Sequence, residues 1–348
     1  MSSANTGKRT KSSFGGLLRQ SNVDLFINNI LIVALLILII YFGFYSSAFL
    51  SFSNFSIILT NDAPIGVLVA FMTLLVIAGH VDLSVGANIA FSGTLAALAN
   101  SKWGISDPLS ILVGLGAGAG IGAINGILCG FLRLNPIIVT LGMLSVVRGA
   151  ILLIEPTDAY GLGGLFNLIG NGSVLGIPIL LLIVTVAFMI SAVFVSLTVW
   201  GRHIYALGIN PQAAFLAALP VRGLPFALYV ITGLAAGVAG VLLVARLDGT
   251  SPGSLGLQME LQALTIILLG GVAFAGGRGR ILGVVTAWIF LGVLTNGLTL
   301  LDITPYVQLV AAGLALVLAA GLDKLGSILG PRFQQQKQVE EQLSVRET

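Results

Sequence analysis

Charged side chains are scarce in this chain of 348 residues, because Asp, Glu, Lys and Arg together make up only 8% of it. A soluble domain carries about 25%. Apolar residues account for 57%, and the mean hydropathy is +1.05. So few polar groups cannot cover so much apolar surface in water, which excludes a cytosolic enzyme and a nucleic-acid-binding protein. The composition instead predicts several transmembrane helices in one bundle.

Cysteine is almost absent, since Cys129 is the only one in the sequence. A single cysteine excludes a disulfide scaffold and a cysteine-based metal site. His80 has no cluster of ligands around it in the sequence, so no metal is expected. The Gly-x-x-x-x-Gly-Lys-Ser/Thr motif that holds ATP phosphates is also missing. We therefore expect a chain that is not an enzyme and binds no cofactor itself, with energy supplied by a partner or an ion gradient.

Long apolar runs predict an all-α, polytopic membrane protein, because lipid cannot satisfy an open backbone. The runs lack the two-residue alternation of a membrane β-barrel. Asn61, Asp62 and Pro64 interrupt the second run, so residues 57–100 form either two full spans or two re-entrant half-helices, which gives ten spans or eight. The ten candidate spans are 25–45, 57–79, 84–100, 108–132, 136–154, 177–199, 224–246, 260–276, 281–301 and 304–322.

Positive charges indicate the orientation of these spans. When the basic tail 1–24 is placed in the cytoplasm, thirteen of the sixteen Lys and Arg residues fall on the inner side, and only Lys102 and Arg246 on the outer side. This asymmetry predicts that both termini are cytoplasmic. The membrane region is then 25–325, and the Gln- and charge-rich tail 326–348 is expected to be disordered.

Glycines recur every four residues along the fourth candidate span. Small residues at this spacing allow two helix backbones to approach closely in a membrane, where little hydrophobic force acts between helices. We interpret the ladder as a helix-packing surface rather than as a lining of the solute path. Its members are Gly114, Gly118, Gly122, Gly126 and Gly130.

The cytoplasmic segment 201–220 has no charged residue between His203 and Arg222. Asn210 is suited to cap a helix and Pro211 to begin it, which predicts a short helix over 212–219 that ends before Pro220. A solvated helix would present a charged face, whereas this one presents Phe215 and Leu216 on a background of alanines. The helix either docks into a groove on a partner protein, which we favour, or lies flat at the membrane interface.

Three motifs occur in a characteristic order: GHVDLSVG at 79–86, the cytoplasmic segment 201–220, and a block from Glu260 that ends in GGRG at 276–279. Together they resemble bacterial ABC-importer permeases of the ribose/xylose/galactose branch, over about residues 25–325. The sequence departs from the family pattern at 217–219, where Ala-Ala-Leu replaces Ser-Gly-Ile, and at His80-Val81. In this family the segment corresponding to 201–220 couples the permease to its ATPase, so we call 201–220 the coupling segment. Its matching residues, to which we add the aromatic Phe215, are Gly201, Arg202, Tyr205, Ala206, Gly208, Asn210, Ala213 and Ala214.

The resemblance implies a translocation subunit in the bacterial cytoplasmic (inner) membrane. Such a subunit works as a pair of copies, with cytoplasmic subunits that bind ATP and Mg²⁺ and with an external solute-binding protein. The implied cargo is a small neutral carbohydrate. Two alternatives stay open: a branched-chain amino-acid ABC permease, which has a similar fold, and an ion-coupled secondary transporter.

Polar residues inside the membrane are costly and usually mark solute paths. Asp82 is expected to cap the following helix or to act as a gate or solute contact, and these roles are compatible. Ser84 and Asn88 share one helix face, where they either bind sugar hydroxyls or join helices. We expect Glu260 to pair with Arg246 across an external loop, with an orientation towards the binding protein as the alternative. Arg148 is expected to reach Glu155. The candidate pathway or gate residues are Asp82, Ser84, Asn88, Asn125, Glu260 and Asn296.

Overall fold

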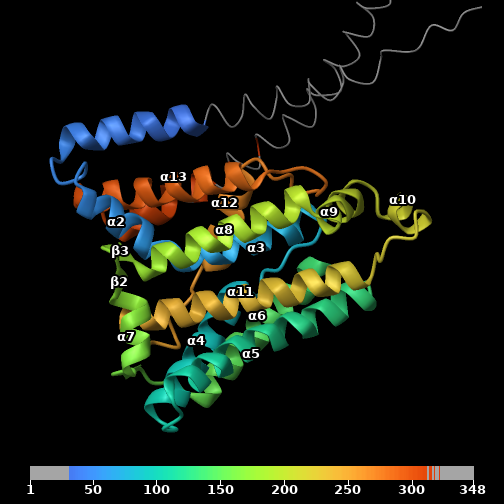
Figure 1. The fold of residues 1–348 in the computed structure, drawn as a ribbon, viewed down its shortest axis with the longest axis horizontal. Helices are drawn as coiled ribbons and strands as arrows, with labels where there is room; N and C mark the ends of the chain where they lie inside the picture. Colours follow the sequence, from blue (N-terminus) through green and yellow to red (C-terminus); the bar gives the residue numbers. More distant parts are fainter. Residues whose placement is uncertain (1–30, 312, 316, 318–320, 322–348) are drawn as a thin grey trace, which may run out of the picture.

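A computed structural model describes residues 31–311, 313–315, 317 and 321 of the protein. The two predicted tails, 1–24 and 326–348, lie outside these residues. Most helices run along one long axis, with α10 (Pro211–Leu216) at one end and α7 (Gly164–Asn171) at the other (Figure 1). The remaining labelled helices are α2 (Phe52–Asn61), α3 (Ala63–Ile77), α4 (Val85–Ser101), α5 (Asp107–Gly126), α6 (Pro136–Ile154), α8 (Ile179–Leu197), α9 (Val199–Ile209), α11 (Gly223–Leu247), α12 (Met259–Leu269) and α13 (Ile281–Leu300).

Five helices of the described region are long and apolar enough to cross a membrane. They are α5 with its π-helical extension Ile127–Phe131, and α6, α8, α11 and α13. These five coincide within a few residues with the predicted spans 108–132, 136–154, 177–199, 224–246 and 281–301. The protein is therefore a multi-pass, helical membrane protein, as its composition predicts.

Other predicted spans are shorter or interrupted. The span 57–79 is not one straight helix, because α2 and α3 meet at Asp62 with a bend of 53°; Pro64 lies in the first turn of α3 and accounts for the break. The span 260–276 is wrong as a full helix, since α12 has only 11 residues and ends where Gly270 and Gly271 follow. α4 has 17 residues and matches the predicted span 84–100 within one residue. The helix Leu31–Tyr45 begins at the edge of the described region, and 304–322 lies partly outside it.

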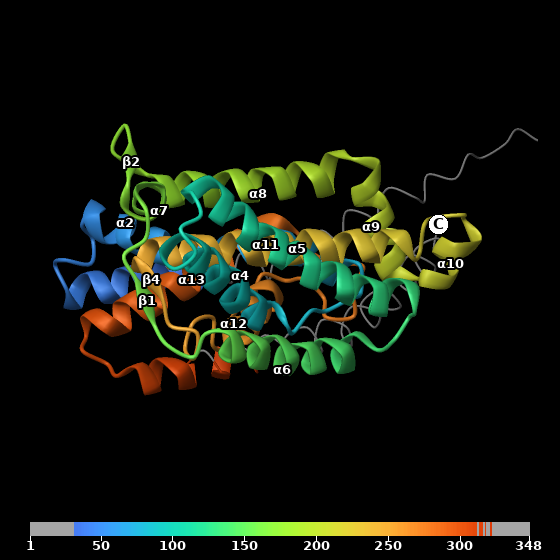
Figure 2. The ribbon, with the colours of Figure 1, turned by 90° about the horizontal axis from the view of Figure 1, so that it is seen from below.

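Four two-residue strands form two small antiparallel sheets in the described region. β1 (Ala159–Tyr160) pairs with β4 (Gly249–Thr250), and β2 (Ser173–Val174) pairs with β3 (Ile177–Pro178). All four lie at the end of the bundle opposite to α10 (Figure 2). They connect loops at this end of the bundle and leave the all-α class unchanged.

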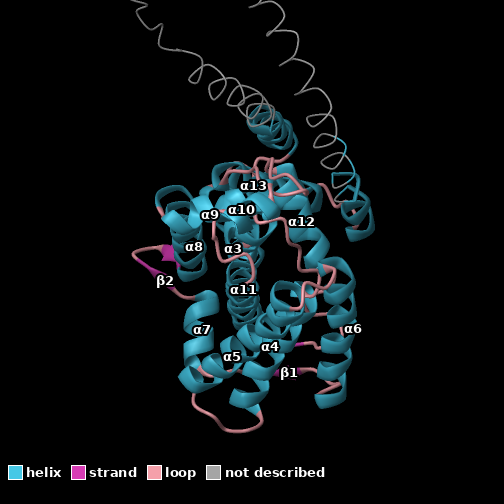
Figure 3. Cartoon of the chain, turned by 90° about the vertical axis from the view of Figure 1, so that its right-hand side faces the viewer, coloured by secondary structure: helices cyan, strands magenta, loops and turns pink. Residues whose placement is uncertain are grey.

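The centre of the bundle is formed by α11 and α3. Two thirds of the residues in the 18-residue apolar stretch of α11 are buried, and nearly all residues of α3 are buried. Viewed from the α10 end, α11 lies among α3, α4 and α5, whereas α6 lies at the periphery (Figure 3). Only 17% of the residues in the corresponding stretch of α6 are buried, so most of this apolar helix faces outward.

Four of the five glycines of the ladder lie directly against the backbone of α11, and the fifth, Gly114, lies nearest to α4. Gly118 faces the backbone of Gly233 and Gly237, and Gly126 faces that of Phe226. A methyl group added at Gly118 would lie 2.6 Å from the Gly233 carbonyl oxygen. Gly120, which is not on the ladder, has no such neighbour within 4 Å. The two backbones therefore touch where side chains are missing, which is the packing that small residues permit in a membrane.

Candidate functional site

A buried polar cluster lies at the non-helical segment between α3 and α4. α3 ends at Ile77, Gly79 follows it in the left-handed region (φ +81°), and the chain continues without helix to Ser84. Asp82 is fully buried, and its Oδ1 accepts hydrogen bonds from the Ser84 amide at 2.9 Å and the Ser84 hydroxyl at 2.6 Å. Ser84, not Asp82, occupies the N-cap position of α4. Asp82 thus binds the turn before the helix, and the N-cap interpretation of Asp82 is wrong by two residues.

Asn125 of α5 completes this cluster, which we call the Asp82 cluster (Asp82, Ser84 and Asn125). Its side-chain amide donates to Asp82 Oδ2 at 3.2 Å and to the Ser84 hydroxyl at 2.8 Å. Its own Oδ1 is buried and has no hydrogen-bond partner among the described residues. A buried acceptor of this kind costs free energy unless a ligand or water satisfies it. The cluster therefore combines carboxylate, hydroxyl and amide groups with one acceptor available for a hydroxyl.

Asn88 lies one turn into α4 and has a different set of partners. Its amide donates to the Gly118 carbonyl at 3.2 Å, and its Oδ1 accepts from Ser92 at 2.9 Å. Its contacts thus join α4 to α5, which is the second of the two roles predicted for Ser84 and Asn88, a hydrogen bond between helices. Ser84, by contrast, belongs to the Asp82 cluster.

Glu260 and Asn296 lie apart from the Asp82 cluster. Glu260 is in the first turn of α12, and its carboxylate lies beside Gly86 of α4, in the space that a side chain at this position would occupy. Asn296 of α13 exchanges two amide hydrogen bonds with Asn54 of α2, at 3.0 and 3.1 Å. Such a reciprocal pair holds two helices together. The six candidates therefore divide into one cluster and separate contacts.

Two expected charge contacts are replaced by others. Arg246 donates to the side-chain oxygens of Asn171 (2.9 Å) and Asn61 (3.2 Å), not to Glu260. Arg148 donates to the Leu255 carbonyl at 2.7 Å instead of reaching Glu155. The chain between α11 and α12 folds back towards α6, which brings its carbonyls to Arg148 and could not be foreseen from sequence spacing.

Glu155, just beyond α6, forms an ion pair with Lys102 from the loop after α4. Hydrogen bonds from Lys102 and Thr157 stabilise the carboxylate and lower the pKa of Glu155 to about 2. This pair connects two loops at the end of the bundle that carries β1. No group of three or more potential metal ligands occurs in the described ranges.

The coupling segment consists of two helices, α9 and α10, of which only the second was expected. Asn210 Oδ1 accepts from the amides of Gln212 and Ala213, both at 3.0 Å, and so caps α10 as its sequence predicts. α10 ends at Leu216, earlier than the predicted end at 219. Thr198 caps α9 in the same way, through the Gly201 amide at 3.1 Å, and this threonine was the overlooked signal for α9.

The predicted coupling residues divide into inward and outward groups. On α9, Gly201 is buried against the backbone of Val195, and Tyr205 and Gly208 are half-buried, while Arg202 is exposed. On α10, Ala214 is buried, whereas Phe215 and Leu216 are 63% and 85% exposed. Most of the Phe215 and Leu216 surface of α10 is therefore exposed in the described part of the chain, and Asn210 and Ala213 are exposed beside it.

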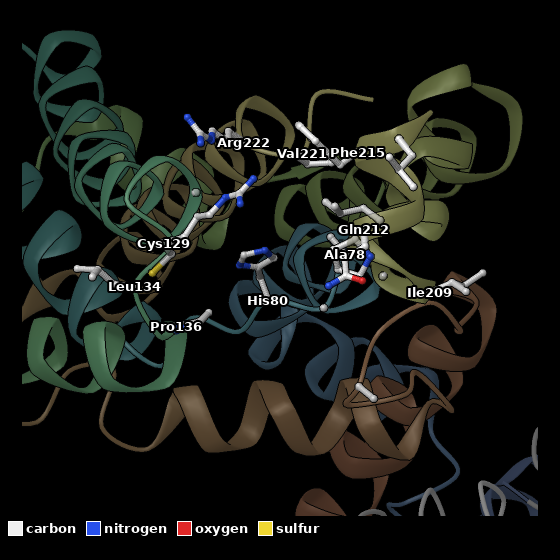
Figure 4. A pocket seen from close by; sticks show the side chains of 18 residues that line it. Ala78, His80, Cys129, Leu134, Pro136, Ile209, Gln212, Phe215, Val221 and Arg222 are labelled. Carbon is white, nitrogen blue, oxygen red and sulfur yellow. The ribbon is translucent and has the colours of Figure 1, made fainter. Parts of the chain in front are cut away.

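A cavity of about 810 Å³ separates α10 from the end of α3 (Figure 4). His80 lies near its middle in Figure 4, and its ring meets Tyr229 of α11 edge-on, with 5.7 Å between centroids. The Tyr229 hydroxyl donates to the Val81 carbonyl at 3.1 Å, one residue before Asp82. The wall also includes Cys129, Gly130, Arg133, Gln212, Phe215 and Arg222. The cavity thus connects the coupling segment with the turn that carries the Asp82 cluster.

Comparison with known proteins identifies the class. Residues 54–320 match the family described as branched-chain amino acid transport system / permease component. The chain belongs to this family of membrane transport permeases. A search of solved structures found no match.

Individual relatives are similar along most of the chain. A ribose import permease of Bacillus subtilis is 35% identical over 84% of this chain and 91% of the relative. A fructose import permease of Rhizobium meliloti is 31% identical over 84% of both chains. A D-allose permease of Escherichia coli is 35% identical over 72% of this chain and 77% of the relative. These relatives are permeases named for sugars, in agreement with the resemblance found in the motifs.

Proposed function

We propose that the chain is the translocation subunit of an ATP-driven importer for a small neutral carbohydrate, such as a pentose, a hexose or a polyol. The observation that carries this proposal is the similarity to permeases named for ribose, fructose and allose, which extends over 72–84% of the chain. The branched-chain amino-acid alternative rests on the family description, but these relatives favour sugars.

The geometry of α10 supports docking of an ATP-binding subunit. A short helix that is capped at its start and exposes Phe215 and Leu216 at one end of the bundle suits insertion into a groove of a partner. A helix lying at the membrane interface would carry Lys or Arg beside its apolar face, and α10 has neither. We therefore assign ATP and Mg²⁺ to partner subunits that bind here.

The Asp82 cluster supports a neutral, hydroxyl-bearing solute. Its amide, hydroxyl and carboxylate groups can donate to and accept from sugar hydroxyls, and Asn125 Oδ1 supplies an acceptor without a partner in the described chain. We propose that this cluster gates or contacts the solute. Proton-coupled transport uses linked titratable groups along the path, and Asp82 contacts a serine and an asparagine instead.

We further propose that two copies of the chain assemble in the bacterial cytoplasmic membrane, with both termini in the cytoplasm. The exposed apolar faces of peripheral helices such as α6 would contact lipid or the second copy. A solute-binding protein would deliver the sugar at the end that carries α7 and the small sheets. This orientation follows from the excess of Lys and Arg on the α10 side.

Reconstitution with the ATP-binding and solute-binding partners tests this function. The complex in nanodiscs should hydrolyse ATP faster when the binding protein is loaded with its sugar than when it is empty. Screening that binding protein with ribose, fructose, D-allose and leucine by thermal shift identifies the solute class. Stabilisation by leucine and by none of the sugars would contradict the carbohydrate assignment.

A further inference from the structure

Three motifs that are distant in sequence meet at one place beside the cavity. The Tyr205 hydroxyl of α9 donates to the Gly279 carbonyl at 2.8 Å, and the Gly277 amide donates to the Ile77 carbonyl at 2.8 Å. These bonds connect the coupling segment, the turn 276–279 before α13, and the end of α3. We call this contact region the junction; it consists of Ile77, Tyr205, Gly208, Gly277 and Gly279.

The junction is a contact between backbones. A methyl group added at Gly208 would collide with Ile77 O and Gly277 N and lie 3.0 Å from Gly277 Cα. A methyl group at Gly276 would lie 2.7 Å from the Cα of Gly79. Because these obstructions are backbone atoms, α9 cannot shift towards the turn or the end of α3 without displacing them.

The chain beyond the junction leads directly to the Asp82 cluster. From Ile77 it passes Gly79 and reaches Asp82 within five residues. Val81 is held by Tyr229 of α11, and Asp82 by Asn125 of α5. This segment is therefore fixed to the coupling segment at one end and to the transmembrane core at the other.

We propose that Tyr205 is a positioning residue whose hydroxyl transmits movement of the coupling segment, through the turn 276–279 and the end of α3, to the Asp82 cluster. The inference rests on the proposed function, in which the partner ATPase moves α9 and α10. It assigns a role to the Gly-Gly-Arg-Gly turn, which docking alone leaves unexplained. α10 supplies the docking surface, and Tyr205 supplies the connection to the interior.

Tyr205→Phe tests this role because it keeps the ring and removes only the hydrogen bond to Gly279. Tyr160→Phe is the matched control, since Tyr160 is exposed at the opposite end and donates to Asp158. In the full complex, Tyr205→Phe should still co-purify with the ATP-binding subunits. Its sugar uptake per ATP should fall about fivefold, the factor expected for one ordinary hydrogen bond, and the control should match wild type.

A second readout does not depend on the partners. Cys129, the only cysteine in the sequence, lines the cavity with His80 and Gly79 and is 3% exposed. In the full chain alone in detergent, Tyr205→Phe should raise the rate of maleimide labelling at Cys129 about fivefold, because the end of α3 opens more often. Tyr160→Phe should label at the wild-type rate.

The outcomes separate the two proposals. Faster Cys129 labelling together with lower uptake per ATP supports the positioning role. Labelling and uptake that are the same in Tyr205→Phe as in Tyr160→Phe overturn it. If wild type takes up no sugar with ATP while the labelling difference persists, the proposed function fails and the mechanical connection of Tyr205 to the cavity stands.

Discussion

Replacement of Gly118 by alanine tests the contact between α5 and α11 most sharply. The added methyl group would lie 2.6 Å from Gly233 O, 2.8 Å from Gly237 Cα and 2.9 Å from Gly237 N. All three obstructions are backbone atoms, so no side-chain rotation relieves them. Gly120→Ala is the matched control on the same helix, because no atom lies within 4 Å of its added methyl group.

The magnitude follows from the distances. Ordinary van der Waals contact begins at 3.4 Å, so α11 must withdraw by about 0.8 Å, the difference between 3.4 and 2.6 Å. Overpacking of this kind costs about 1–3 kcal/mol. The gain in helix propensity from glycine to alanine, about 0.5–1 kcal/mol, is common to both variants and cancels in their comparison. Gly118→Ala should therefore be about 1–3 kcal/mol less stable than Gly120→Ala.

Thermal unfolding of both variants in the same detergent measures this difference. Gly118→Ala should melt several degrees below Gly120→Ala, and the loss should also appear as reduced yield of folded protein on size-exclusion chromatography. Equal melting temperatures for the two variants would show that the α5 ladder does not carry the packing between these helices.

The remaining predictions concern docking, the Asp82 cluster and the ion pair between Lys102 and Glu155. Phe215→Asp should leave the melting temperature unchanged, since this side chain is 63% exposed, but should abolish co-purification with the ATP-binding subunits; retained binding contradicts the assignment of α10. Asn125→Leu removes two donors from the buried cluster and should cost about 1–3 kcal/mol in detergent unfolding while abolishing uptake, whereas unchanged uptake would exclude Asn125 from the solute path. The pKa of Glu155 is lowered from 4.5 to about 2, so its stabilising effect is complete above pH 4.5 and is lost as the pH falls towards 2. The difference in melting temperature between wild type and Glu155→Gln should accordingly be equal at pH 7 and pH 5 and should shrink at pH 3; a difference that does not change with pH refutes this account.

The full-length spans could be predicted from the sequence because hydropathy over about 20 residues is a local property. The cap of α10 was equally local, since Asn210 and Pro211 act within one turn. The interruption at Asp62 was visible in Pro64 and its polar neighbours. For these features, residue chemistry within a short window determines the structure.

Features that depend on distant contacts could not be read in this way. The hydropathy of 260–276 is that of a full span, yet α12 ends at Leu269, and glycines that follow it lie against the backbone of α3, α9 and α13. Arg148, Arg246 and Glu155 each had plausible partners nearby in sequence, but the fold brings other acceptors and donors to them. Asn125 was one of several buried asparagines, and only the approach of α5 to the α3–α4 turn joins it to Asp82.

Uptake into sealed proteoliposomes tests the central proposal most directly. Vesicles containing the permease and its ATP-binding subunits, with the solute-binding protein outside, receive the radiolabelled sugar that this binding protein recognises. The account predicts accumulation that requires ATP inside and the binding protein outside, and that persists when a protonophore collapses any proton gradient. Accumulation driven by a proton gradient without ATP would contradict it.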